Sequence, residues 1–529
     1  METNVADLLA TAAQVEPEKT ALSEASTGRS VTWAGLDDLA DRLAGGLTRA
    51  GMVTGYRVVV ITTNRIEFVA TYLGALRAHL VVVPVNPRSA TGEVIRILAD
   101  SGARMVVADG STIDLVRDAV GGLVGAIEAS PEEVPGAVRP RVVTVGAPAA
   151  EGELAWDDLV ALPPSEPIPS RADDEGLAVL LYTSGTSGRP RAAMLSHRAL
   201  LANIEQAAAV EPRLITGQDV VFGVLPLFHV YGLNAVLGQV LRQHARMVLV
   251  DGFDPEGSLD IIEDEAISVV PVAPAVFAYW MQVPSLEDRL GPVRLALSGS
   301  APLSPELTAA FTERTGVQVH QGYGLTEAAP VVTSTQCSRT VVPGSVGAAL
   351  PGIELRLVDE AGHEPGVEDG GEIHVRGDNL FSGYWPDGTD GPDADGWWAT
   401  GDVGYLDEDR NLFLVDRLKE LVIVSGFNVY PSEVEDVIAE LPDVAAVAVI
   451  GVDDEATGEA VVAYVKPRSD VDPDGLADRV RAHCDARLAR FKQPAVVHVV
   501  DDLPYTYTGK VQKGRLRATE RRRALGLLE

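Results

Sequence analysis

A short run of hydroxyl, glycine and cationic residues at positions 182–191 has the composition of a phosphate-binding loop. It reads Tyr-Thr-Ser-Gly-Thr-Ser-Gly-Arg-Pro-Arg and follows the apolar stretch Ala178–Tyr182, which predicts a strand. Glycines let backbone N–H groups approach an anion, hydroxyl groups add donors, and a cation balances the phosphate charge. The spacing is neither the Walker A pattern nor the dinucleotide pattern. Taken alone, the alternative is a polar turn that requires glycines.

This loop has the chemistry needed to activate an acid with a nucleoside triphosphate. A carboxylate that attacks a phosphoryl group brings two anions together, so an enzyme must supply cations and fixed donors around the transition state. Further segments contain residue types suited to this work: a histidine among apolar residues, small-residue turns, and single carboxylates or cations near glycine. In chain order they are Leu225–Gly232, Ser298–Leu303, Gln321–Glu327, Thr400–Asp402, Asp416–Glu420 and Thr508–Lys510.

In composition and order these segments resemble the signatures of the adenylate-forming superfamily, which contains acyl- and aryl-CoA ligases, peptide-synthetase adenylation domains and firefly-type luciferases. The resemblance extends from roughly Ala21 to Lys513. Several independent matches in the family's order are far more specific than one loop. The resemblance implies an ATP-dependent acid–thiol ligase with Mg²⁺ and coenzyme A. It would form an acyl-AMP and pyrophosphate first, and then an acyl-CoA and AMP.

The resemblance assigns the nucleotide site to several segments. The loop would hold the phosphates, a small-residue turn would lie beside the adenine, and Tyr323 would stack on the adenine ring. A carboxylate can accept hydrogen bonds from both ribose hydroxyls, so Asp402 suits the ribose site. The ATP- and AMP-binding residues implied are Thr183, Ser184, Gly185, Thr186, Ser187, Gly188, Arg191, Gly299, Ser300, Ala301, Gln321, Gly322, Tyr323, Thr326, Asp402 and Arg417.

Catalytic roles fall, by the same resemblance, on Lys510, His229, Thr326 and Glu327. Lys510 would bridge the attacking carboxylate and the α-phosphate, and Thr326 would meet the same phosphate. Glu327 would be the metal ligand, because a carboxylate together with phosphate oxygens is a usual site for Mg²⁺. Without this context, Lys510 is a solvated surface charge and His229 is a satisfied core histidine.

The acyl pocket is implied along the segment that carries His229, with His229 at the carboxylate entrance. Its wall would consist of Tyr231, Ala235 and Gly324, together with Gly232, Ala273 and Ala275. These small side chains would leave room for a chain, and Val424–Pro431 resembles bacterial fatty-acyl-CoA ligases. Plant hydroxycinnamate ligases carry lysines at the positions of Ile423 and Ser425. A medium- or long-chain fatty acid is therefore predicted, with a bulky aryl acid as the alternative because 228–231 also resembles aryl ligases.

A movable small domain is also implied by the resemblance. It would swing about the hinge residue Lys419 between the two half-reactions, so that Lys510 leaves the site. The segment Ser425, Gly426 and Phe427 would then help to form the channel for the pantetheine thiol of coenzyme A. Domain closure would keep water from the labile acyl-AMP.

The chain departs from the family pattern in two places. The phosphate loop ends in Pro-Arg-Ala where the family has Pro-Lys-Gly. Arg191 keeps the charge, while Ala192 loses the backbone freedom of glycine, so we expect retained activity with altered ATP handling. Near the C-terminus, Tyr505 and Tyr507 replace a lysine and a proline of the family's lysine loop, but the Gly-Lys pair remains.

Alternating strand and helix patterns supply the elements that must position these residues. Arg57–Thr62 and Leu80–Val85 are β-branched runs that suit buried parallel strands, and Glu67–Ala78 between them has a helical pattern. Gly371–Arg376 and Leu412–Val415 indicate an antiparallel β region. The predicted fold class is α/β: a large N-terminal domain of α/β layers plus a β region, followed by a small, mobile α+β domain.

A chain of 529 residues is too long for one hydrophobic core, so two domains are expected. Residues 1–415 are predicted to be the adenylation core with the ATP and acyl sites. Residues 416–529 are predicted to be the mobile domain with the catalytic lysine. Ser432 and Glu435 predict a capping box at the start of a helix in this domain. Ser304 or Pro305 predicts another helix start, after the turn at 298–303.

Composition limits the partners and the setting. The net charge of −33 disfavours nucleic acid and anionic membranes as partners. Two cysteines without metal-ligand spacing, and an N-terminus without a signal-peptide pattern, indicate the cytoplasm. The longest apolar stretch, Ile267–Trp280, contains two prolines and is too short to span a bilayer, so no transmembrane segment is expected. The sequence leaves the oligomeric state open.

Two other functions remain open from the sequence. One is an adenylation enzyme that loads a separate carrier protein in place of coenzyme A. The other is a non-catalytic sensor that binds a nucleotide or an acyl ligand in a degenerate site. The Arg191–Ala192 departure supports the sensor, whereas the charged residues Glu327, Asp402, Arg417 and Lys510 argue against it.

Overall fold

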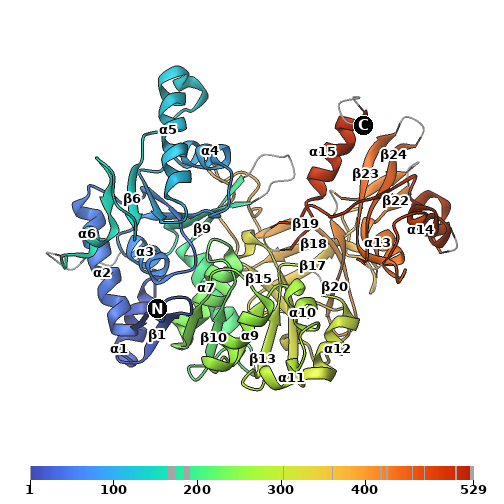
Figure 1. The fold of residues 1–529 in the computed structure, drawn as a ribbon, viewed down its shortest axis with the longest axis horizontal. Helices are drawn as coiled ribbons and strands as arrows, with labels where there is room; N and C mark the ends of the chain where they lie inside the picture. Colours follow the sequence, from blue (N-terminus) through green and yellow to red (C-terminus); the bar gives the residue numbers. More distant parts are fainter. Residues whose placement is uncertain are drawn as a thin grey trace. The chain divides into compact units, whose positions relative to one another are not determined.

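The computed structural model describes the chain outside positions 1, 165–167, 169–172, 184–190, 302, 360, 368, 418–419, 425–426, 455–456, 470, 486, 507–508 and 525–529, and gives only the backbone at 133, 416–417, 427–428, 458 and 524. The chain divides into two compact units (Figure 1). The first comprises Met1–Gly185, Pro190–Glu354 and Arg376–Trp398, and the second includes Leu355–Val375 and Ala399–Glu529. The predicted division at residue 416, between an adenylation core and a mobile domain, stays a prediction.

The first unit contains a seven-stranded sheet whose paired strands are parallel except at the edge formed by β8 and β9. Valine-rich strands such as β3 are buried, as expected for a sheet with both faces covered by helices. The order is β7 (Leu154–Ala155), β6 (Arg141–Val145), β5 (Met105–Asp109), β3 (Arg57–Ile61), β4 (Val81–Pro84), β8 (Leu177–Thr183), β9 (Arg191–Ser196). Helix α2 (Trp33–Arg49) precedes β3, and the helices between these strands include α3 (Ile66–Arg77), α4 (Thr91–Ser101), α5 (Ile113–Ala129) and α6 (Trp156–Val160).

A nine-stranded sheet forms the rest of this unit. Its order is β16 (Ala348–Ala349), β15 (Val331–Ser334), β14 (Gln318–Gly324), β13 (Leu295–Ser298), β12 (Val269–Val272), β10 (Val220–Gly223), β11 (Arg246–Leu249), β1 (Thr20–Glu24), β2 (Ser30–Thr32). The helices in the same part of the chain are α1 (Asp7–Val15), α7 (His197–Ala208), α8 (Leu237–Gln243), α9 (Pro255–Asp264), α10 (Pro274–Trp280), α11 (Leu286–Arg289) and α12 (Pro305–Thr315).

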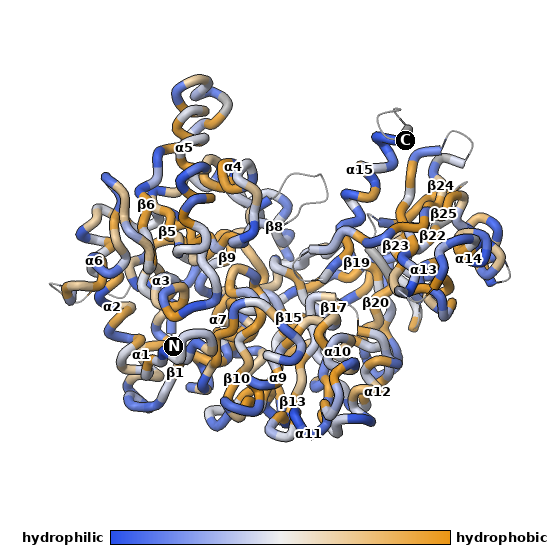
Figure 2. The backbone as a smooth tube through the Cα atoms, in the orientation of Figure 1, coloured by the Kyte–Doolittle hydropathy of each residue, from blue (hydrophilic) through white to orange (hydrophobic). Residues whose placement is uncertain are grey.

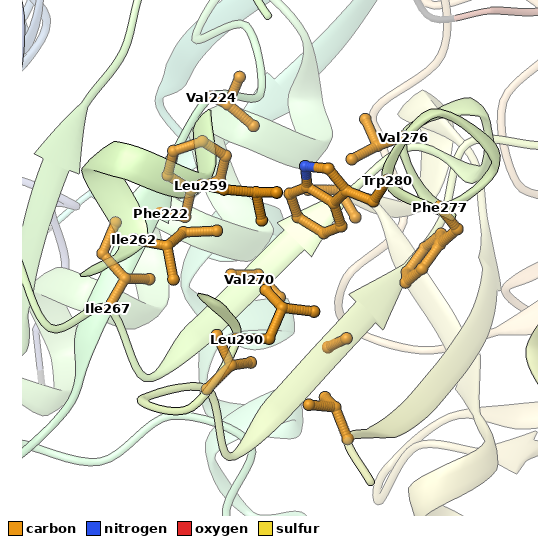
Figure 3. Close-up of a cluster of buried hydrophobic side chains, with 14 of the residues drawn as sticks. Phe222, Val224, Leu259, Ile262, Ile267, Val270, Val276, Phe277, Trp280 and Leu290 are labelled. Carbon is orange, nitrogen blue, oxygen red and sulfur yellow. The ribbon is translucent and has the colours of Figure 1, made fainter. Parts of the chain in front are cut away.

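The core of this sheet is built around buried aromatic rings (Figure 3). Phe277 and Phe311 meet edge to face with ring centroids 5.0 Å apart. The indole N–H of Trp280 donates to the Ser258 hydroxyl at 2.9 Å, which satisfies its only polar group. The apolar stretch Ile267–Trp280 is thus accounted for by β12 and α10 in the core. No helix in the described part of the chain combines the length and apolarity that crossing a bilayer requires.

The second unit contains two smaller sheets. One has the order β17 (Glu354–Val358), β18 (Gly371–Arg376), β19 (Trp397–Leu406), β20 (Leu412–Arg417), and the other has the order β22 (Phe427–Val429), β21 (Val422–Val424), β24 (Gly458–Pro467), β23 (Val444–Asp454), with β25 (Val496–Val499) beside β24. Helices α13 (Pro431–Ala439), α14 (Leu476–Asp485) and α15 (Lys513–Ala524) complete the unit. Figure 2 shows the apolar β23 in orange and the arginine-rich α15 largely in blue. The predicted α/β fold class, with a β region and a smaller α+β part, is confirmed.

The two predicted helix starts have different outcomes. Ser304 caps α12 by accepting a hydrogen bond from the N–H of Leu307 at 3.1 Å, as predicted. The capping box at Ser432 is wrong, because α13 begins at Pro431 and Tyr430 is its N-cap. The Ser432 hydroxyl donates to the carbonyl of Val415 at 2.6 Å instead. A tertiary hydrogen bond has therefore replaced the local cap that the spacing suggested.

One buried histidine fixes the N-terminal segment. His197, at the start of α7, accepts a hydrogen bond from the N–H of Val5 through Nδ1 at 3.2 Å. Burial lowers its pKa to about 4, because the charged imidazolium would lose its hydration. This contact requires the neutral ring, since Nδ1 must carry a lone pair.

Both cysteines are free thiols. Cys484 is buried in the core of the second unit and Cys337 is half-buried in the first. Burial raises the pKa of each thiol to about 11. Neither cysteine therefore has the lowered pKa that marks a reactive thiolate.

Candidate active site

The predicted phosphate loop joins two strands of an antiparallel pair. Thr183 ends β8 and Arg191 begins β9, and the two residues are direct partners. The Thr183 hydroxyl also donates to the carbonyl of Arg191 at 3.4 Å. The loop residues between them, including the predicted Ser184, Gly185, Thr186, Ser187 and Gly188, lie outside the described residues. The strand pair therefore fixes both ends of the loop.

The position of Ala192 in β9 explains why the chain tolerates alanine where the family has glycine. It pairs with Tyr182 in the sheet and is 2% exposed. Its carbonyl accepts a hydrogen bond from the N–H of Trp385 at 2.9 Å. A strand residue needs no left-handed backbone, and its methyl group adds to the buried core. The substitution therefore does not distort the strand that carries Arg191.

Arg191 contacts two residues that the sequence analysis did not select. Its guanidinium pairs with the Asp390 carboxylate at 2.7 Å and lies 3.7 Å from the centroid of the Tyr384 ring. The Tyr384 hydroxyl in turn donates to Oε1 of Glu327 at 2.6 Å. Burial and the Glu327 carboxylate raise the pKa of Tyr384, so the phenol stays protonated and can donate.

Glu327 lies in a short 3₁₀ turn, Thr326–Ala328, that follows β14. Its side chain is buried at 8% exposure, and its carbonyl accepts the N–H of Phe381 at 2.9 Å. The predicted Thr326 begins the same turn. Among the described residues, no group of three or more His, Cys, Asp or Glu side chains forms a metal cage. A single carboxylate still fits Mg²⁺, which is usually held by one or two carboxylates with substrate phosphates and water.

The adenine-side residues lie on β14. Gln321 and Tyr323 are anchored by their N–H groups, which donate to the hydroxyls of Thr335 at 3.1 Å and Thr333 at 3.2 Å. The Tyr323 ring is 7% exposed. At Gly322 a Cβ would lie 2.6 Å from the carbonyl oxygen of Thr333, so the neighbouring β15 requires glycine there. This close pairing defines the edge of the predicted adenine site.

A turn after β13 contains the predicted Gly299, Ser300 and Ala301. Ser300 has φ +74°, a conformation that non-glycine residues rarely adopt outside functional or tight turns. A Cβ at Gly299 would lie 2.9 Å from the ring of Tyr231. The turn and the predicted acyl wall are therefore in direct contact.

The His229 segment enters a single π-helical stretch, Tyr231–Val236, which also contains Ala235. Such stretches are rare and occur frequently at functional sites. The N–H of His229 donates to the carbonyl of Pro226 at 3.1 Å, and its Nδ1 accepts the N–H of Tyr231 at 3.3 Å. His229 is half-buried.

Two glycines of the predicted acyl wall face backbone. A Cβ at Gly232 would lie 2.3 Å from the carbonyl oxygen of Pro226, and one at Gly324 would lie 2.2 Å from that of Pro330. These glycines permit close chain packing on the side where a side chain would lie, and their place in the acyl wall stays a prediction.

Asn64 is a third residue that the sequence did not single out. It follows β3 and clamps the segment that leads to His229. Its amide group donates to the carbonyls of Gly223, Leu225 and Val250, at 3.0, 2.9 and 3.3 Å. Its side-chain oxygen accepts the N–H of Leu227 at 3.0 Å. The available signal in the sequence was a polar residue shortly after a buried parallel strand, because ligand sites of α/β sheets gather at the carboxyl ends of the strands.

The remaining described site residues belong to the second unit. Asp402 on β19 and Arg417 on β20 are direct register partners. Asp402 is 8% exposed, and its N–H donates to the Thr400 hydroxyl at 3.1 Å. Lys510 is exposed in a turn in which its N–H donates to the Thr506 hydroxyl at 3.0 Å. Lys419, Ser425 and Gly426 lie outside the described residues, and Phe427 is described only as backbone in β22.

Comparisons with known proteins match nearly the whole chain. The AMP-binding enzyme family matches residues 9–385, and its AMP-binding enzyme C-terminal domain matches residues 433–510. A 4-coumarate–CoA ligase-like protein of Oryza sativa subsp. japonica is 34% identical over 526 residues, covering 96% of this chain and 90% of its own. A long-chain-fatty-acid–CoA ligase of Bacillus subtilis is 31% identical, covering 94% and 91%. The ATP-bound crystal structure of MatB from Rhodopseudomonas palustris superposes with a TM-score of 0.86 at 33% identity, covering 98% and 99%.

Proposed function

This chain belongs to the AMP-binding enzyme family and is an AMP-forming acid–thiol ligase, and from this premise we propose that it converts a carboxylic acid, ATP and coenzyme A into an acyl-CoA. The observation that carries the proposal is the connection from Arg191 through Tyr384 to Glu327 in the first unit. It joins the cation at the end of the phosphate loop to the carboxylate best suited to a metal. Such a pairing serves a triphosphate substrate.

The first half-reaction forms the acyl-AMP. A carboxylate oxygen of the acid attacks the α-phosphorus, a new O–P bond forms, and pyrophosphate leaves as the bond to its bridging oxygen breaks. Lys510 would balance the charge between carboxylate and α-phosphate, and Arg191 would bind phosphate oxygens. Asp402 and Arg417 would bind the ribose. Mg²⁺, held by Glu327 and phosphate oxygens, would supply positive charge at the triphosphate.

The second half-reaction transfers the acyl group to sulfur. The thiol of coenzyme A loses its proton and attacks the acyl carbon, the C–S bond forms, and AMP leaves as its C–O bond breaks. Here we assign Lys419 as the hinge and Ser425, Gly426 and Phe427 to the thiol channel. The cytoplasm, where ATP and coenzyme A are available and thiols stay reduced, is the proposed setting.

The acid has two candidate classes. The prediction of a medium- or long-chain fatty acid, and with it a role in fatty-acid metabolism, is supported by the identity to the Bacillus subtilis ligase. An aryl acid is supported by the identity to coumarate ligases and by Tyr231, whose ring occupies the space above Gly299. In the predicted acyl wall, this ring would offer a flat surface for stacking on an aryl acid. A carrier protein in place of coenzyme A is the third variant, with the same first step.

ATP–pyrophosphate exchange across a panel of saturated fatty acids, benzoates and cinnamates tests the proposal. We expect exchange with at least one class, and thioester formation when free coenzyme A is added. Exchange without thioester would favour a carrier protein as acceptor. ATP binding without AMP formation for any acid would contradict the proposal and favour the sensor.

A further inference from the structure

Tyr384 connects two residues that come from distant segments and share the proposed phosphate chemistry. Its hydroxyl donates to Glu327 Oε1 at 2.6 Å, and its ring carries the Arg191 guanidinium at 3.7 Å from the ring centroid. Arg191 begins β9, whereas Glu327 lies in the turn after β14. Tyr384 thus connects Arg191, at the end of the predicted phosphate loop, with the Glu327 carboxylate, the proposed metal ligand. All three residues belong to the first unit.

The backbone of Tyr384 is held against β9. It forms isolated bridges with Ala193 and Thr389, and the neighbouring Trp385 donates its N–H to the carbonyl of Ala192 at 2.9 Å. Gly383 before it has φ +90°, and a Cβ there would lie 2.1 Å from the carbonyl oxygen of Gly388. Only glycine satisfies both conditions. The sheet edge and this tight turn therefore fix the backbone position from which the Tyr384 side chain extends.

The ring itself is held on several sides. Phe381 meets it edge to face, with centroids 5.0 Å apart and planes at 78°. Arg191 covers a ring face and is itself retained by Asp390 at 2.7 Å. A cation over the face draws electron density from the ring, which makes the phenol a stronger donor. The Phe381 N–H also donates to the Glu327 carbonyl at 2.9 Å, so backbone and side chain of Glu327 are anchored by neighbouring residues.

We propose that Tyr384 is a positioning residue that holds the Glu327 carboxylate in the orientation required by the Mg²⁺–ATP complex. The inference rests on the proposed function, in which Glu327 is the metal ligand. A short bond from a neutral donor to a carboxylate is charge-assisted and directional. It occupies one oxygen and fixes the plane of the carboxylate. Without it, a buried carboxylate must reorient before it can bind the cation, and this reorientation weakens metal binding.

The test uses Tyr384→Phe, which removes one oxygen and keeps the ring that Phe381 and Arg191 contact. Mn²⁺ serves as the probe, and its binding to the full-length protein in saturating ATP is followed by electron paramagnetic resonance of free Mn²⁺. We expect about tenfold weaker Mn²⁺ binding, with ATP binding in the presence of EDTA unchanged. Tyr279→Phe is the matched control, because Tyr279 is 52% exposed, and it should bind Mn²⁺ as the wild type does.

Glu327→Gln separates the inference from the function on which it rests. If Glu327→Gln weakens Mn²⁺ binding and Tyr384→Phe leaves it unchanged or tighter, the positioning role is overturned while the metal assignment stands. If Glu327→Gln itself has no effect, the assignment of Glu327 in the proposed function fails. Excess Mn²⁺ should restore the exchange rate of Tyr384→Phe, which a general loss of folding would prevent.

Discussion

The side-chain oxygen of Asn64 accepts the N–H of Leu227 at 3.0 Å, two residues before His229. The same carboxamide donates to the carbonyl of Leu225 at 2.9 Å, so one side chain from the segment between β3 and α3 holds both sides of Pro226. Pro226 in turn accepts the N–H of His229 and packs against Gly232. The geometry of the proposed acyl entrance therefore depends on a residue far away in the sequence.

Replacing Asn64 by alanine should loosen this segment. The change leaves the polar groups of Leu225 and Leu227 unpaired, which costs about 1–3 kcal/mol of stability for each buried group without a partner. We expect the KM for the acid to rise about tenfold while the KM for ATP changes less than twofold. Steady-state kinetics in both substrates measures the split. Asn86→Ala, in an exposed turn after β4, is the control, and equal changes in both KM values would contradict the positioning role.

Lys510→Ala should separate the two half-reactions. Loss of a cation that acts only on the adenylation transition state should reduce ATP–pyrophosphate exchange by about 10²-fold or more. Thiolysis of supplied acyl-AMP by coenzyme A should stay within about threefold of the wild type, because Lys510 has no proposed role there. Lys466→Ala, which removes a lysine paired with Asp502 in the same unit, should affect neither step. Equal losses in both steps would refute the assigned role.

Asp390→Asn should strengthen ATP binding. Asp390 pairs with Arg191 at 2.7 Å and would compete with phosphate oxygens for the guanidinium. The Asp390 side chain is 70% exposed, so the competition is weak and we expect a KM for ATP about two- to fivefold lower. Asparagine tolerates the left-handed backbone at this position, where φ is +55°. Asp387→Asn is the control, because Asp387 is exposed in the same loop and the substitution removes an equal charge.

Two outcomes would contradict this competition. One is an equal gain in Asp387→Asn, because the effect would then be a general change in net charge. The other is a gain that persists at high ionic strength, since an exposed ion pair is screened by salt.

The burial of His197 is expected to reduce the stability of the protein in mild acid. Burial depresses its folded pKa to about 4 from an ordinary value near 6.5, so the unfolded chain binds the proton first. The contribution of neutral His197 to the free energy of unfolding is complete above pH 6.5. It decreases by about 3 kcal/mol in total as the pH falls toward 4. Urea unfolding at pH 7, 6 and 5 measures the free energy of unfolding. Between pH 7 and pH 5 this free energy should fall less in His197→Asn, which keeps an acceptor for Val5, than in the wild type. The exposed His363→Asn should decline as the wild type does.

The sequence could predict those parts of the fold and site that depend on neighbouring residues. β-Branched runs predicted β3 and β4, and the Ser304 cap is a local hydrogen bond. The Ser432 prediction failed because its hydroxyl found a partner on β20, seventeen positions away. The sequence could not show that backbone carbonyls crowd the Cβ side of Gly232 and Gly324. Asn64, Tyr384 and Asp390 were missed for the same reason: their importance lies in contacts that only the folded chain creates.

The two cysteines bear directly on how this enzyme can be assayed. Burial raises the pKa of both thiols to about 11, so little thiolate is present at pH 8 and reagents that titrate free coenzyme A should react slowly with the protein. Colorimetric consumption of coenzyme A should then report turnover with little background. Alkylating agents that stop the reaction by capturing coenzyme A should modify the two cysteines of the protein far more slowly than coenzyme A.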